Sequence, residues 1–382
     1  MEKKLTDNNT SNTLKPVNNT PVASGTAEAN GDIPSGKSGE KKRLPIFDNF
    51  RGLIIFLTII FNFMHNLPVT PFRILHAPEY INSVHFKDIG VVAFIAVLSF
   101  LFSHNFQSKA KRMKLSEVYR FYILKSFVLI GFGFTFRFFE VNFIDSGLTE
   151  GVHTTNFNVF VSYGFMTLFS LLFIQLKSLP RLIIGSGLIA VHQFVILNNA
   201  ALTQSIIDNS QGGIVAILSW VGLCLIASAI GDYYFKDKKK FYAATLAVIG
   251  VGIIYVILNL SVSNEAFLAQ IFLNKRLATA GYIFVSLAVT LCAFVIFDQI
   301  DYLSKRSIPL ISEIGQSALF FFVLGGLLDF IIKGFFSLTF GDLLFREGIA
   351  AAAAGITAVL LTGLLTLTAA WVFRKCKIRI VL

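Results

Sequence analysis

Charged residues are scarce in this chain of 382 residues, since Asp, Glu, Lys and Arg together make up 14% of it. Ordinary soluble domains carry about 25% charged residues. Hydrophobic residues make up 54% of the chain, which is more than a polar surface can cover. The composition therefore excludes a soluble globular enzyme.

Cysteine and proline are also rare. The three cysteines form no C-x-x-C pair, which excludes a disulfide framework and an obvious zinc site. The contrast of 41 Phe with nine Pro argues against a fibrous or disordered chain. No glycine-rich phosphate-binding motif occurs, so nucleotide-driven transport has no support.

Residues 1–43 differ in composition from the remainder. They are rich in Asn, Thr, Ser, Gly and Lys and have almost no large apolar side chains. Such a segment cannot bury enough surface to offset the entropy of ordering it. No apolar stretch follows Lys3-Lys4, so the segment is not a signal peptide. We predict a disordered cytoplasmic tail over 1–43 and a multi-pass membrane domain over 44–382.

Long apolar runs fill the rest of the chain. About 20 apolar residues in a helix span the hydrocarbon core of a bilayer. The runs are continuous rather than alternating, which excludes the strands of a membrane barrel. The sequence predicts an all-α polytopic membrane protein with about ten transmembrane helices, near 50–67, 88–105, 118–139, 157–176, 181–199, 212–232, 241–261, 277–298, 308–332 and 348–373.

Basic residues are distributed unevenly among the loops. Nineteen Lys and Arg, with Arg181 among them, fall in one alternating set of loops, whereas six fall in the other set. The positive-inside rule makes the first set cytoplasmic, and with it both termini. Topology and contact with anionic lipids then explain the net charge of +11, and no nucleic-acid partner is expected.

Five ionisable residues fall inside predicted spans, where charges are costly and often mark functional sites. They are Lys125, Arg137, His192, Glu313 and Asp329. Arg137 and Asp329 are expected near the outer face, where they can pair. Lys125 can snorkel toward the cytoplasmic face.

Histidines concentrate on the predicted outer side, at His65, His76, His85 and His153. Their spacings match no compact metal-ligand motif, so no metal is predicted. A lone histidine suits a general base for acyl transfer, because its ordinary pKa of about 6.5 lets it take a proton at neutral pH.

A series of short motifs carries a family resemblance. In chain order they are Asp48-Asn-Phe-Arg51-Gly52, Asn62 late in the same helix, Leu75-His76-Ala77-Pro78, Asp88 at the next span, Leu273-Asn274-Lys275-Arg276-Leu277 and Gly315-Gln316-Ser317-Ala318-Leu319-Phe320. In order and rough spacing they resemble the heparan-α-glucosaminide N-acetyltransferase family and its bacterial transmembrane acyltransferase relatives. The chain resembles a divergent member, because Gln316 and Ala278 replace the usual Asn and Trp and the middle Gln-Arg pair is absent near 159–163.

The resemblance implies transfer of an acetyl group from cytoplasmic acetyl-CoA to an extracytoplasmic sugar amine or hydroxyl. It implies His76 as the catalytic base or acetyl carrier and Asn62 as a donor to the thioester carbonyl. Asp88 either orients the imidazole or caps its helix. The residues expected to bind the acceptor are Asn274, Lys275 and Arg276.

The expected donor site lies on the cytoplasmic side. Arg51, at the entry of the first span and one turn from Asp48, suits the phosphates of CoA. The basic cluster before the third span suits them equally, through Lys109, Lys111 and Arg112.

Two other readings stay open. The first is a polysaccharide O-acetyltransferase of the second bacterial membrane acyltransferase family, with His65 as the catalytic histidine. The second is a transporter or flippase for a lipid-linked sugar or small solute. The expected membrane is the bacterial plasma membrane rather than the lysosomal membrane. The expected partners are lipids, a glycan or amino-sugar acceptor and, as an open alternative, a second copy of the chain in a homodimer.

Overall fold

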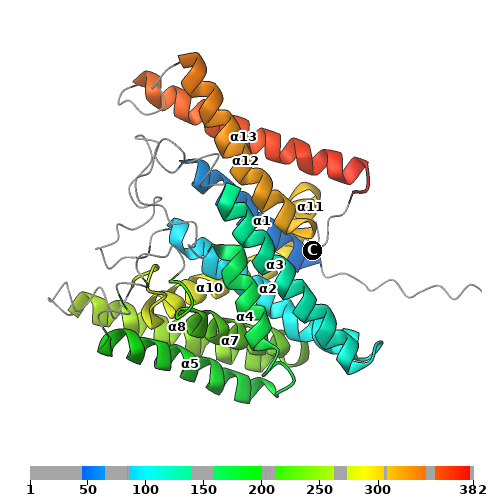
Figure 1. The fold of residues 1–382 in the computed structure, drawn as a ribbon, viewed down its shortest axis with the longest axis vertical. Coiled ribbons are helices and arrows are strands. Elements are labelled where there is room, and N and C mark those ends of the chain that lie inside the picture. Colours follow the sequence, from blue (N-terminus) through cyan, green and yellow to red (C-terminus); the bar gives the residue numbers. More distant parts are fainter. Residues whose placement is uncertain are drawn as a thin grey trace, which may run out of the picture. The chain divides into compact units, whose positions relative to one another are not determined.

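A computed structural model describes residues 45–64, 84, 86–139, 158–199, 203, 206, 212–261, 273–304, 308–340 and 349–378. By its contacts the chain divides into Met1–Arg43 and Leu44–Leu382. The predicted cytoplasmic tail lies outside the described residues. Within the described residues no strand occurs, and the second unit is a bundle of helices (Figure 1).

The helices in chain order are α1 (Pro45–Met64), α2 (Phe86–Ala110), α3 (Leu115–Phe139), α4 (Val159–Ser170), α5 (Ser178–Asn198), α7 (Ile217–Lys236), α8 (Lys238–Ser261), α10 (Ala280–Ser304), α11 (Pro309–Gln316), α12 (Ala318–Phe340) and α13 (Ile349–Lys375). In the described part of the chain, nine of them are long and apolar enough to cross a membrane. The chain is an all-α, multi-pass membrane protein, as the apolar runs predicted.

Two of the ten predicted spans differ from this pattern. The span near 157–176 is the twelve-residue helix α4, which begins where the Asn158 side chain accepts hydrogen bonds from the Phe160 and Val161 amides. The span near 308–332 is two helices, because Ser317 adopts a non-helical backbone (φ −114°, ψ 41°) between α11 and α12. Hydropathy reports apolar length alone, so it predicted neither the short helix nor the break.

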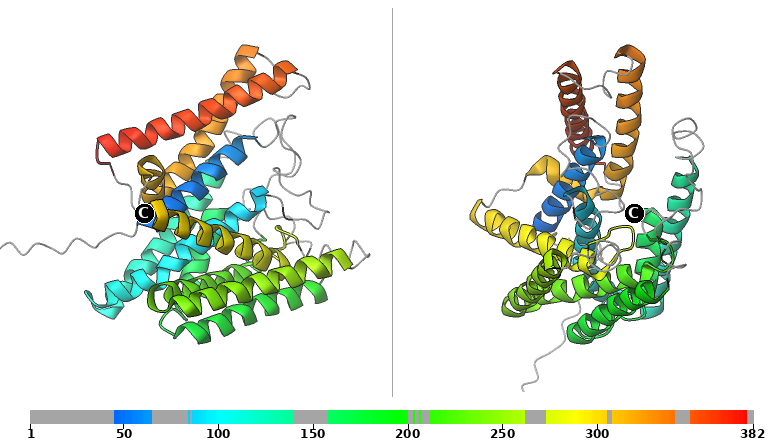
Figure 2. Two further views of the ribbon diagram at one scale, coloured as in Figure 1. Left: turned by 180° about the vertical axis from the view of Figure 1, so that it is seen from behind. Right: turned by 90° about the vertical axis from the view of Figure 1, so that its left-hand side faces the viewer.

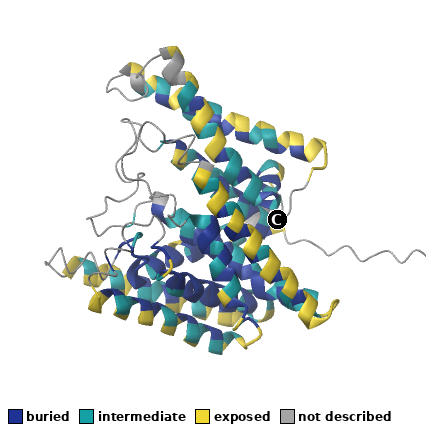
Figure 3. Cartoon of the chain, in the orientation of Figure 1, coloured by how far each residue is buried: buried dark blue, intermediate teal, exposed yellow. Residues whose placement is uncertain are grey.

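The helices form a larger and a smaller group, and α7 is the centre of the larger one. It packs against α2, α4, α5 and α8, and fifteen of its twenty residues are buried. The dark blue core in Figure 3 lies along it and its neighbours. Trp220 and Cys224 are almost completely inaccessible there. By contrast, one face of α8 carries exposed apolar residues such as Leu246 and Leu260, as expected for a surface that meets lipid.

A smaller group of helices consists of α1, α11, α12 and α13, as the two views of Figure 2 illustrate. Its core joins Ile55, Ile314 and Phe321. Where α1 crosses α11, a Cβ added at Gly52 would overlap the Ile311 carbonyl, and one added at Gly315 would overlap the Asp48 carbonyl. Only glycine permits these two backbones to approach so closely.

Contacts between first and last turns fix the direction of the helices. The Phe47 ring, in the first turn of α1, lies 5.5 Å from the Phe235 ring in the last turn of α7. The Phe320 ring, at the start of α12, lies 4.6 Å from the Phe373 ring near the end of α13. Because α11 ends against the start of α1, the described segment begins and ends at one end of the bundle. We call it the basic end, since it holds Arg51, and the other the Asp88 end.

Candidate functional site

Asp88 and Lys275 come together at the Asp88 end, although 187 positions separate them. Asp88 lies in the first turn of α2 and is buried. The Lys275 ammonium lies 3.4 Å from its carboxylate, with 17% of the lysine side chain exposed. The Tyr282 hydroxyl, from α10, donates to the Asp88 backbone carbonyl at 2.7 Å. The structure therefore brings a residue predicted to be catalytic beside one predicted to bind the acceptor.

The loop that carries Lys275 is fixed by its own polar groups. The Asn274 side-chain oxygen accepts from the Leu277 amide at 3.1 Å. The Thr279 hydroxyl accepts from the Asn274 amide at 3.1 Å, and the Thr279 amide donates back to the Asn274 carbonyl at 3.2 Å. Ala278 has a φ of +47°, which few residues other than glycine adopt. Hydrogen bonds within the loop therefore fix the backbone that carries Lys275.

Side chains of helix α5 form hydrogen bonds to the backbone of the same loop. The His192 Nε2–H donates to the Leu277 carbonyl at 2.8 Å, and the Gln193 side-chain oxygen accepts from the Ala280 amide at 2.9 Å. Gly212 (φ +74°) packs against the Arg276 carbonyl, where a Cβ would approach it to 2.8 Å. His192 was singled out in the sequence as an intramembrane charge, and its role here is to anchor the loop.

The electrostatics of Lys275 follow from its position. Burial lowers the pKa of the Lys275 ammonium below its ordinary value, and the nearby Asp88 carboxylate opposes that shift. The Asp88 carboxylate thus favours the charged form of Lys275 against the cost of its burial. A cation held in this way can fix a hydroxyl, carboxylate or sulfate of a ligand.

Not every predicted catalytic residue joins this cluster. Asn62 lies in the last turn of α1 and is exposed. It shares the Asp88 end, because Thr58, one turn earlier, lies within van der Waals distance of the position that a Cβ on Gly90 would take. His76 lies outside the described residues. The histidines at 65, 85 and 153 lie outside them as well.

The predicted donor residues are at the basic end. The Arg51 guanidinium donates to the Asp48 carboxylate at 2.8 Å, and both side chains are mostly buried. Lys111 and Arg112 are exposed on the turn between α2 and α3. The Lys109 ammonium lies 4.0 Å from the centre of the Phe121 ring. The structure thus separates Arg51, set into the bundle, from the surface cations.

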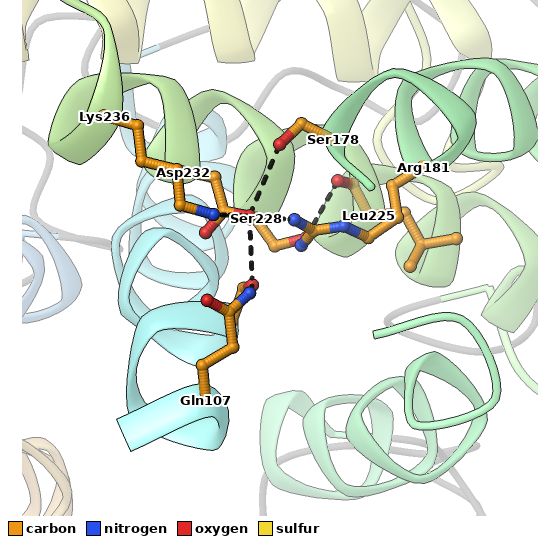
Figure 4. A network of polar contacts seen from close by, with 8 residues as sticks. Gln107, Ser178, Arg181, Leu225, Ser228, Asp232 and Lys236 are labelled. Carbon is orange, nitrogen blue, oxygen red and sulfur yellow. Dashed lines mark hydrogen bonds and ion pairs between the residues drawn. The ribbon is translucent and has the colours of Figure 1, made fainter. Parts of the chain in front are cut away.

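The basic end also contains a buried polar network that was not predicted from the sequence (Figure 4). Arg181 of α5 and Asp232 of α7 form an ion pair that is 0% and 3% exposed. Arg181 also donates to the Ser228 hydroxyl at 2.8 Å. The carboxylate accepts from Ser103 of α2 at 3.2 Å and from Ser178 at 3.4 Å. The network ties three helices together.

Arg181 therefore corrects the charge assignment made from the sequence. It was counted among the loop cations that set topology, but it lies in the first turn of α5 with its charge inside the protein. The available signal was Asp232, a carboxylate at the end of an apolar run. An arginine and an aspartate that flank apolar runs are candidates for a buried pair, because neither charge is stable in lipid alone.

The remaining intramembrane charges lie elsewhere. Asp329 pairs with Lys333, one turn later on α12, at 2.7 Å. The Lys333 ammonium also lies 5.4 Å from the centre of the Phe63 ring on α1. Glu313 is buried in α11, and Lys125 is half-buried on α3. The pairing of Asp329 with Arg137 stays a prediction.

Comparison with known proteins yields no match, either to a family model or to a curated protein.

Proposed function

We propose that the protein is a membrane acyltransferase that moves an acetyl group from acetyl-CoA to a sugar amine or hydroxyl across the bilayer. The observation that carries the proposal is the Asp88–Lys275 pair at the end of the bundle opposite Arg51. The family resemblance singles out Asp88 for catalysis and Asn274 and Lys275 for binding the acceptor. Asp88 is far from the other two in sequence, yet all three lie in one cluster.

The proposed roles combine the positions of the described residues with the roles that the family resemblance implies. Arg51 offers a bidentate donor to a phosphate of CoA at the basic end. Lys275 holds an oxygen of the acceptor, and Asn274 shapes the loop that positions it. His76 takes the proton from the acceptor amine or hydroxyl as the acetyl carbon–oxygen or carbon–nitrogen bond forms. The leaving thiolate of CoA takes up a proton, so that the reaction is balanced.

An acetyl-transfer assay tests this function. Purified protein in lipid nanodiscs is supplied with labelled acetyl-CoA and a panel of amino-sugar and hydroxyl acceptors. We expect acceptor-dependent loss of label from CoA. We expect His76→Ala to lose about 10² to 10⁴ in rate, as for removal of a general base. Absence of transfer to every acceptor would contradict the proposal.

The choice of donor-side residues has its own test. Arg51→Ala should raise the KM for acetyl-CoA. Arg51→Lys should restore the KM only in part, because lysine lacks the planar fork.

If His76→Ala keeps normal turnover and His65→Ala is inactive, the polysaccharide O-acetyltransferase reading replaces this one. The proposed location is a bacterial plasma membrane.

A transporter for a lipid-linked sugar or small solute is the second candidate. The broken helix α11–α12 and the buried Arg181–Asp232 pair favour it, since discontinuous helices and intramembrane ion pairs are common in transporters. Uptake of a labelled solute into proteoliposomes, with no consumption of acetyl-CoA, would support this candidate.

A further inference from the structure

His192 is a buried polar side chain that links helix α5 to the candidate site. It lies about 21 Å along the axis of α5 from Ser178, so it approaches the Asp88 end. Its side chain is fully buried, and its Nε2 atom lies 2.8 Å from the Leu277 carbonyl oxygen. A carbonyl oxygen can only accept, so Nε2 carries the proton and donates. Burying an imidazole is costly without such a bond, so the side chain is tied to this one backbone group.

The Leu277 backbone is held at both of its polar groups. Its carbonyl accepts from His192, and its amide donates to the Asn274 side-chain oxygen at 3.1 Å. The next residue, Ala278, has a φ of +47°, which is strained for a residue with a side chain. The carbonyl that His192 holds belongs to the peptide bond directly before this strained position. His192 therefore helps to keep the loop in a conformation that the chain alone disfavours.

The position of Lys275 depends on the same short stretch of backbone. Lys275 lies between Asn274 and Leu277, and its ammonium lies 3.4 Å from the Asp88 carboxylate of α2. The hydrogen bond from the Leu277 amide to Asn274 closes a turn around the two residues between them. A shift of the Leu277 peptide therefore moves the base of the Lys275 side chain. A misplacement of about 1 Å can cost an active site about 10²-fold in rate.

The neighbouring side chain on α5 restrains a different part of the chain. The Gln193 side-chain oxygen accepts from the Ala280 amide at 2.9 Å. Ala280 is the first residue of α10 and follows the strained Ala278. Gln193 thus fixes the start of α10, whereas His192 fixes the loop that precedes it.

We propose that His192 is a positioning residue for the acceptor: by holding the Leu277 carbonyl, it fixes the loop that places Lys275 beside Asp88. The inference rests on the proposed function in assigning the acceptor to Lys275. His192 acts as a hydrogen-bond donor and carries no proton in the reaction, in contrast to the role proposed for His76. The affinity for the acceptor then depends on a side chain of α5 that acts through the loop backbone.

Three substitutions separate hydrogen-bond donation from the other properties of the imidazole. His192→Gln keeps an N–H donor at nearly the position of Nε2. His192→Asn keeps an amide but is too short to reach that position. His192→Leu removes the donor. Ile189→Ala is the matched control, because Ile189 is buried one turn earlier on α5 and packs into the core rather than against the loop.

Amide hydrogen exchange of the loop 273–280, followed by mass spectrometry in lipid nanodiscs, tests the positioning without any acceptor. We expect exchange to be about tenfold faster in His192→Leu and His192→Asn, because the loop opens more often without the donor. Exchange in His192→Gln and Ile189→Ala should stay within about twofold of wild type.

Acetyl transfer at varied acceptor concentration tests the consequence for the reaction. We expect His192→Leu to raise the KM for the acceptor about tenfold with little change in kcat, since lost binding affects KM alone. His192→Gln should recover most of the acceptor affinity and keep the wild-type pH profile of kcat, because a glutamine donates but does not titrate.

The outcomes separate the inference from the proposed function. Unchanged exchange and an unchanged KM in His192→Leu would overturn the inference and leave the acyltransferase proposal standing. Normal exchange but lost turnover in His192→Gln would overturn it as well, because the imidazole would then carry a proton. If wild-type protein transfers no acetyl group to any acceptor, the proposed function fails, and exchange still decides whether His192 holds the loop of Lys275. If His192→Leu does not insert into the membrane, the comparison of His192→Asn with His192→Gln decides in the same way.

Discussion

The Lys275 ammonium at the Asp88 end makes the free energy of unfolding depend on pH. Burial lowers its pKa, so between the lowered value and the ordinary one of about 10.4 the unfolded chain binds more protons than the folded chain. The free energy of unfolding therefore rises with pH through that window. At neutral pH the buried cation costs stability, and the Asp88 carboxylate offsets part of that cost.

Asp88→Asn removes that carboxylate and should destabilise the protein by about 3 kcal/mol at pH 7, because it leaves a buried cation without its partner. The pKa of Lys275 should fall further, so the variant should regain more stability than wild type as the pH rises from 7 to 10. Thermal unfolding in detergent across this pH range measures both effects. Asp298→Asn is the control. Its partner Lys238 is 49% exposed, so water can solvate that cation when the carboxylate is removed. A deficit that does not change with pH would contradict the account.

At the scale of helices, the Arg181–Asp232 pair connects α5 to α7, and Ser103 extends the connection to α2. Arg181→Met leaves the carboxylate buried and should cost about 3 to 5 kcal/mol. The double variant Arg181→Met, Asp232→Leu should recover most of this loss, since two apolar side chains need no partner. A double-mutant cycle of unfolding free energies measures the coupling. Purely additive losses would show that the pair acts as two separate contacts.

The crossing of α1 and α11 gives a second prediction for helices. Gly52→Ala places a methyl group against the Ile311 carbonyl, so the two helices must move apart. We expect a loss of about 1 to 3 kcal/mol from overpacking and a higher KM for acetyl-CoA, because Arg51 moves with its helix. Gly187→Ala is the matched control, since a Cβ there meets nothing within 4 Å. It should be neutral or stabilising by up to about 1 kcal/mol. Equal behaviour of the two variants would contradict the close approach.

Most elements of the fold follow from apolar run length, and the exceptions have specific causes. Ser317 ends a helix within an apolar run, and no hydropathy window detects a change in one residue's backbone. At the site, Asp88 and Lys275 were each predicted to be functional, but their ion pair was not predicted, because 186 intervening residues leave no local signal. Arg181 was misjudged because a cation at the edge of an apolar run can turn inward as well as outward.

For the whole molecule, the direction of the helices makes a topological prediction. The described segment begins and ends at the basic end, where Cys376 is exposed just after α13. Ser261, at the last residue of α8, lies at the opposite end and is exposed. Whichever way the bundle is inserted, these two positions should lie on opposite sides of the membrane.

Labelling with a membrane-impermeant maleimide tests this arrangement in intact cells. With a cytoplasmic basic end, as the loop charges predict, Cys376 should react only after permeabilisation. Ser261→Cys, in a background with Cys376→Ser, should react without it. The endogenous Cys224 is buried and serves as an internal negative control. The reverse pattern would invert the orientation and keep the fold. Labelling of both positions from the same side would require an even number of crossings between Ser261 and Cys376, and would remove the pairing of helix ends on which the two-sided reaction depends.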